Sequence, residues 1–190
     1  MVEGLKIVGL CVAAAIVYGI LHDLVTANLC VEYFSVFHPP IFHTNSPWLL
    51  ALGWGVIATW WMGLFLGPLI AAASLTGELP KLGWRDLVVP IVRLLLTSYA
   101  CALVAGLIGF FVVKRIPSWI YTNYPRMNYA HLGPQGQRYF MAALSAHYAS
   151  YVVNGIGAFV VCALTIRRRM IMHREGMLQR KFPEFGSQNS

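Results

Sequence analysis

Polar and ionisable side chains lie inside two of the most apolar stretches of this 190-residue chain. The first stretch carries Tyr18, His22, Asp23 and Thr26, and the last carries His147, Ser150, Tyr151 and Asn154. Spacings of three and four residues place each set on one side of a helix. Burying such groups in hydrocarbon is costly unless they are paired, so both sets are expected to point into the protein.

The two histidines are expected at similar heights in a membrane. His22 follows Lys6 by 16 residues, which is roughly 24 Å of helix. His147 precedes Arg167 by 20 residues, which is roughly 30 Å from the same boundary. Both therefore fall near the outer edge of the hydrocarbon core.

The loop after the first apolar stretch brings more potential ligands to this level. It contains Glu32, His38 and His43, and Pro39 and Pro40 make its turn rigid. Imidazole and carboxylate groups are the ligands used for zinc, iron or manganese. The predicted metal ligands are His22, Asp23, Glu32, His38 and His147.

Four interpretations of this cluster remain open at this stage. It is a metal site, or a hydrogen-bond network that only satisfies buried polar groups. A third interpretation is proton transfer or catalysis without metal, for which the candidates are His22, Asp23, His147 and Tyr151. In the fourth, His22 and His147 bind a haem as its two axial ligands.

Four long apolar runs must position these residues. They cover residues 5–30, 49–74, 87–113 and 139–166, and each has the roughly 20 residues that a helix needs to cross a bilayer. The chain is 58% hydrophobic and 11% charged, whereas a soluble domain carries about 25% charged residues. The prediction is an all-α, polytopic membrane protein with four transmembrane helices in an up-down bundle and two outer loops rich in proline and aromatic residues.

The distribution of basic residues predicts the orientation. Nine Lys and Arg residues lie on the side of the two termini, against four on the other side. By the positive-inside rule both termini are cytoplasmic, and a bacterial inner membrane is the expected location. Residues 1–168 then form the transmembrane domain and 169–190 a basic cytoplasmic tail.

The basic tail predicts contact with a membrane surface. The residues expected to bind anionic lipid headgroups are Arg167, Arg168, Arg169 and Arg174. The bilayer explains the high isoelectric point, and no nucleic-acid-binding motif is present in the sequence.

Small residues recur every four positions in the second run, at Gly55, Thr59, Gly63 and Gly67. Such a stripe permits close approach of two helices, either within the chain or in a homo-oligomer or larger membrane complex.

Two functional classes follow. The first expectation is an accessory or structural subunit of a membrane assembly, with a buried His/Asp network near the outer face. The alternative is a membrane-embedded enzyme or redox protein that depends on a divalent metal or a haem. The sequence does not decide whether the protein is an enzyme.

Overall fold

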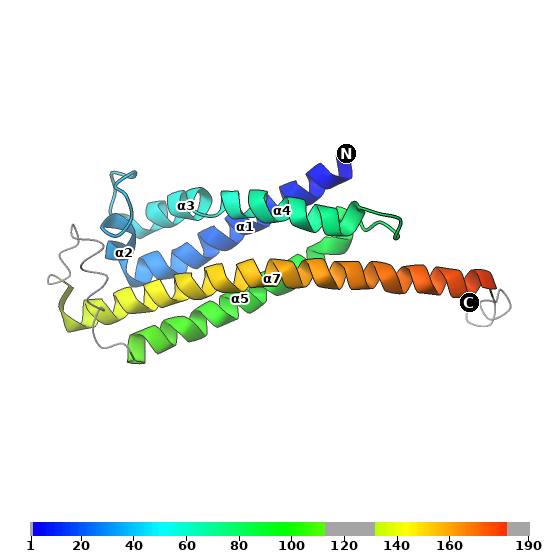
Figure 1. Cartoon of the computed structure of the whole chain (residues 1–190). Coiled ribbons are helices and arrows are strands. Elements are labelled where there is room, and N and C mark those ends of the chain that lie inside the picture. The colour runs from blue at the N-terminus through cyan, green and yellow to red at the C-terminus, as the bar shows by residue number, and fades with distance from the viewer. Residues whose placement is uncertain (1, 113–131, 182–190) are drawn as a thin grey trace.

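The computed structural model describes residues 2–112 and 132–181, and this part of the chain is helical without strands. The helices are α1 (Val2–Leu29), α2 (Val31–Ser35), α3 (Pro47–Ile57), α4 (Trp60–Leu75), α5 (Trp84–Val112) and α7 (Gly133–Lys181) (Figure 1). Within the described residues, four stretches are long and apolar enough to cross a membrane: Val2–Leu29, Pro47–Leu75, Trp84–Val112 and Gly133–Arg180. The predicted all-α protein with four membrane-crossing stretches is thus confirmed at this level.

Two helix boundaries differ from the prediction. The second apolar run is interrupted at Ala58 and Thr59, between α3 and α4. The Thr59 hydroxyl donates to the Gly55 carbonyl at 2.5 Å, a contact that competes with regular helix bonding and bends helices. The fourth helix begins before residue 139 and continues through most of the predicted tail, because Arg, Met, Glu and Gln are good helix formers outside lipid as well.

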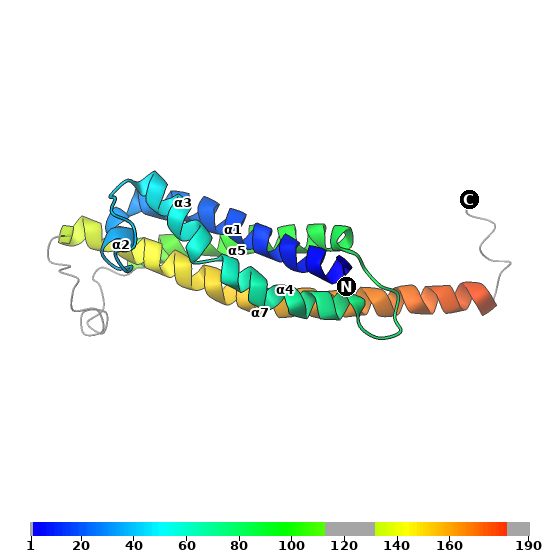
Figure 2. The ribbon, with the colours of Figure 1, turned by 90° about the horizontal axis from the view of Figure 1, so that it is seen from above.

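Helix α1 is central in the packing. It contacts α3 and α4 along one side and also touches α5 and α7, while α5 packs along α7. Figures 1 and 2 show the long helices side by side, each running opposite to the long helix before it in the chain. Most of the predicted second outer loop, from residue 113 to 131, lies outside the described residues.

The small-residue stripe of the second run faces α1 within the same chain. A Cβ atom added to Gly55 would lie 2.6 Å from the Cα of Ile20, and one added to Gly63 would lie 2.6 Å from the Cα of Val12. Distances this short leave no room for a side chain. The stripe therefore allows the α1 backbone to approach α3 and α4 closely.

The structure places Arg169 in the interior of the protein, and not at lipid headgroups as predicted. Its side chain is buried and donates hydrogen bonds to the carbonyls of Ala73 at 2.7 Å, Thr76 at 2.7 Å, Leu79 at 3.0 Å and Pro80 at 2.8 Å. These carbonyls lie at and beyond the C-terminus of α4, where helix carbonyls lack partners and the helix dipole favours a cation. Arg169 thus joins α7 to the α4–α5 connection.

The other three predicted lipid-binding arginines are exposed. Arg168 forms an ion pair with Asp86 at 3.0 Å. Arg167 and Arg174 have exposed side chains along α7. Only these exposed positions are compatible with contact to headgroups.

Candidate functional site

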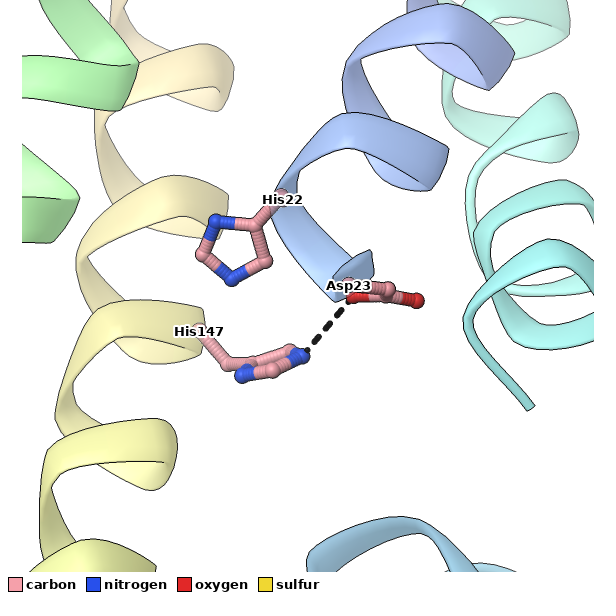
Figure 3. A group of neighbouring side chains, drawn as sticks. All are labelled: His22, Asp23 and His147. Atoms are coloured by element: carbon pink, nitrogen blue, oxygen red, sulfur yellow. Dashed lines mark hydrogen bonds and ion pairs between the residues drawn. The ribbon is translucent and has the colours of Figure 1, made fainter. Parts of the chain in front are cut away.

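His22 and Asp23 of α1 meet His147 of α7 in the interior of the helix bundle (Figure 3). All three side chains are buried, and one potential ligand atom from each lies within 4.8 Å of the other two. The His22 and His147 ring centroids are 4.5 Å apart, with the ring planes nearly perpendicular. The two helices thus bring the histidines together, as their matched heights in the sequence suggested.

The backbone fixes the tautomer of His147. Its Nδ1 lies 2.7 Å from the carbonyl of Ala143, one turn earlier in α7. A carbonyl only accepts hydrogen bonds, so Nδ1 carries the proton and Nε2 of the neutral ring is left with a lone pair. An Nδ1 hydrogen bond to a backbone carbonyl is also how metal-binding histidines are oriented.

The His147 Nε2 atom lies 3.2 Å from Oδ1 of Asp23. An ionised carboxylate offers only lone pairs, as does the neutral His147 at this nitrogen. Two acceptors at this distance repel each other unless a positive species lies between them. That species is either a proton, carried by His147 or by Asp23, or a metal ion that both groups could bind.

His22 contributes an unsatisfied nitrogen. Among the described residues, its buried Nε2 has no hydrogen-bond partner, and its Nδ1 lies 3.5 Å from the Ser150 hydroxyl, the outer limit of a hydrogen bond. In Figure 3 the His22 ring points toward His147. Buried polar atoms are rarely left without partners, so this nitrogen requires an explanation.

A hydrogen-bonded layer links three helices next to this group. The Tyr18 hydroxyl lies 2.9 Å from the Ser98 hydroxyl and 2.7 Å from the Ser150 hydroxyl. Asn154 Nδ2 donates to Ser98 at 2.9 Å. The sequence singled out Tyr18, Ser150 and Asn154 as polar residues. Ser98 was missed as a hydrogen-bond partner, although the three consecutive hydroxyl-bearing residues Thr97, Ser98 and Tyr99 in the third apolar run were a signal available.

His38 lies beside the group but is not part of it. Its Nδ1 donates to the Tyr33 carbonyl at 2.8 Å, and its ring stacks on Phe34 at a centroid distance of 5.4 Å. Burial lowers the pKa of His38 below its usual range, which keeps the ring neutral. It lines the same cavity as His22, Asp23 and His147.

Two other loop residues expected near the site are elsewhere. Glu32 accepts a weak hydrogen bond from the Cys30 thiol at 3.5 Å and is not a member of the His/Asp/His group. The short helix α2 directs Tyr33 and Phe34 into the core instead. His43 is exposed. Of the five predicted metal ligands, His22, Asp23 and His147 therefore come together in one group, whereas Glu32 and His38 lie outside it.

The geometry does not fit a haem held between His22 and His147. Axial ligands lie on opposite faces of the macrocycle, which must pass between them. Here the two rings are in edge contact at 4.5 Å, and no space for a macrocycle separates them.

A cavity of about 110 Å³ extends from this group into the bundle. Its polar end is lined by His22, Asp23, His38 and His147, together with Ser150 and Tyr151. Tyr151, a predicted catalytic candidate, thus lies in the cavity wall but outside the His/Asp/His group. The remaining wall is mostly aliphatic. This combination of an apolar cavity and a few convergent polar groups is typical of ligand sites.

Comparison with known protein families, with curated proteins and with solved structures finds no match for this chain.

Proposed function

We propose that this integral membrane protein binds a divalent first-row metal ion through His22, Asp23 and His147 and acts as a metal-dependent enzyme. One observation carries the proposal: three buried ligand atoms from two helices lie within 4.8 Å of one another. The Nε2 of His22, which has no partner among the described residues, supports it. The contact between His147 Nε2 and Asp23 Oδ1 is compatible with it, since one cation would satisfy all three groups.

The donor set narrows the choice of metal. Two imidazoles and one carboxylate suit zinc and ferrous iron, and calcium or magnesium would favour an all-oxygen set. A metal with three protein ligands keeps a position for water or substrate, where it acts as a Lewis acid or generates a nucleophilic hydroxide. The cavity beside the group is the place from which a substrate would reach it.

The second candidate is an accessory or structural subunit whose buried network contains no metal. The 3.2 Å contact between His147 and Asp23 supports it, because a proton on His147 turns this contact into an ion pair. Under this alternative the unpartnered Nε2 of His22 has no role.

Metal analysis of the purified protein separates the two candidates. Cells are grown with zinc, iron and manganese, and bound metal is measured per chain. The metal site predicts close to one ion in the wild type and almost none in His22→Ala or His147→Ala. His43→Ala, an exposed histidine, is the matched control and should retain the ion. A wild type that holds no metal, and takes up none when the ions are added to it, would favour the accessory subunit.

The membrane topology is a separate proposal. The loop charges support an up-down bundle of residues 1–168 in a bacterial inner membrane, with both termini and a basic tail of residues 169–190 in the cytoplasm. The exposed Arg167 and Arg174 are then available to anionic headgroups. Reporter fusions at the C-terminus and in the loop before α3 test this orientation. Assembly into a homo-oligomer or larger complex stays a prediction.

A further inference from the structure

The cavity beside the His/Asp/His group is long and narrow. It reaches from Asp23 at one end to Cys11, Ile70 and Ile91 at the other. Cys11 and Asp23 are 12 residues apart on α1, which corresponds to about 18 Å of helix. A volume of about 110 Å³ spread over this length leaves room for a chain of atoms but not for a bulky ring system.

The two ends of the cavity differ in chemistry. The end at His22, Asp23 and His147 offers nitrogen and oxygen atoms. The middle part is lined by small and aliphatic side chains such as Ala15, with the polar side chains of Tyr18, Thr59 and Asn154 among them. The far part, at Leu66, Ile70 and Ile91, is lined by mainly aliphatic side chains. Apolar cavities do not hold water well, so the far part is suited to hydrocarbon.

The position of the cavity indicates where its ligand comes from. All four stretches able to cross a membrane contribute to its wall. Tyr151 lines the cavity and is also 41% exposed on the outer surface of the bundle. A ligand dissolved in the bilayer therefore has the cavity wall within reach.

From these features we infer that the substrate is a single-chain amphiphile, with an oxygen-bearing head group at His22, Asp23 and His147 and a linear hydrocarbon tail in the cavity. The placement of the head group rests on the proposed metal site. The placement of the tail rests only on the shape and apolar lining of the cavity, so the two can fail separately.

Alkyl hydroxamates test the whole inference, because a hydroxamate head binds metal through two oxygens. The protein is loaded with Co²⁺ in lipid nanodiscs, and binding is followed by the visible spectrum of the ion. Acetohydroxamic acid probes the head site alone, and dodecanohydroxamic acid probes head and tail together.

Two substitutions on α1 make a matched pair. Ala15→Leu adds bulk to the middle of the cavity, whereas Ala13→Leu adds the same bulk to an exposed position two residues away. We expect Ala15→Leu to weaken dodecanohydroxamate binding by about tenfold or more, since several methylene groups lose their place. Acetohydroxamate binding should be unchanged in both variants. If Ala15→Leu weakens the binding of both probes equally, or weakens the binding of neither, the assignment of the tail to this cavity is overturned.

A photoreactive probe tests the tail without the metal and without relying on Ala15→Leu folding correctly. Dodecanoic acid with a diazirine at its chain end is cross-linked to the protein in nanodiscs, and labelled residues are mapped by mass spectrometry. Labels at Cys11, Ile70 or Ile91 that unlabelled dodecanoic acid competes away support the inference. Labels confined to exposed residues overturn it. Labelled cavity residues in a protein that binds no metal would keep the tail site and refute the metal proposal.

Discussion

Two buried polar clusters, about 33 Å apart along α7, differ in how completely their atoms are paired. At one end Arg169 donates to four carbonyls around the C-terminus of α4. At the other end, the buried Nε2 of His22 has no partner among the described residues, and the contact between His147 Nε2 and Asp23 Oδ1 requires a proton or a cation. The arginine cluster is paired within the protein and joins α7 to the α4–α5 connection, whereas the His/Asp/His group keeps an unpartnered nitrogen, which supports the proposed ligand site.

The physical basis is the cost of unpaired polar atoms. A buried donor or acceptor without a partner costs about 1–3 kcal/mol, more when charged. Arg169 avoids that cost within the protein itself. The Nε2 of His22 has no such partner among the described residues, and one bound cation would satisfy it together with His147 and Asp23.

The largest effect on stability is expected at Arg169. Arg169→Met keeps most of the side-chain volume but leaves four carbonyls without their donor, among them the buried carbonyl of Ala73, so we expect a loss of about 3 kcal/mol in the free energy of unfolding. Thermal and denaturant unfolding in detergent measure it. Arg167→Met, at an exposed position of the same helix, is the control. Equal stability of the two variants would contradict the claim that Arg169 stabilises the packing of the helices.

A smaller effect is expected in the hydroxyl layer. Tyr18→Phe removes the group that bridges Ser98 and Ser150, which costs about 1 kcal/mol for hydrogen bonds of this kind. Tyr148→Phe, at an exposed tyrosine, should be neutral in the same unfolding assay. If Tyr18→Phe is also neutral, the hydroxyl layer does not stabilise the fold as the Arg169 cluster does.

The protonation of His38 adds a weaker, pH-dependent contribution. Burial lowers its pKa in the folded protein, so below the unfolded value of about 6.5 the unfolded chain binds a proton that the folded chain does not. The contribution of His38 to the free energy of unfolding is therefore fully present above about pH 6.5 and is lost as the pH falls toward the pKa of the folded protein. His38→Gln should flatten the decline of the melting temperature between pH 7 and pH 5. An unchanged slope would mean that His38 is accessible to water.

The smallest effect on stability is expected at His22 in the metal-free protein. Phenylalanine is close in shape and removes the unpartnered nitrogen, so His22→Phe should change the unfolding free energy by no more than about 0.5 kcal/mol. Unfolding after treatment with a chelator measures this. A loss comparable to that of Arg169→Met would show that His22 is part of the scaffold, and the contrast between the two clusters would fail.

The sequence predicted those features of the site that depend only on helix geometry. Similar heights for His22 and His147 follow from the helix rise and the membrane boundaries, and Asp23 follows as a neighbour of His22. The separation of Glu32 from the group did not follow, because it depends on how α2 packs Tyr33 and Phe34.

The role of Arg169 was also out of reach of the sequence. Its acceptors are backbone carbonyls about 90 residues earlier in the chain, and no residue type marks a carbonyl that lacks a partner. Within a run of arginines, only the tertiary packing of α7 against the end of α4 distinguishes Arg169 from its exposed neighbours.

X-ray absorption at the metal edge of the purified, metal-loaded protein tests the central claim most directly. Two imidazoles and one carboxylate predict nitrogen and oxygen ligands at about 2.0–2.2 Å, with the outer-shell scattering of two imidazole rings. Loss of one imidazole contribution is expected in His147→Ala. A spectrum without imidazole scattering, or one unchanged by that substitution, would contradict the assignment of the metal to His22, Asp23 and His147.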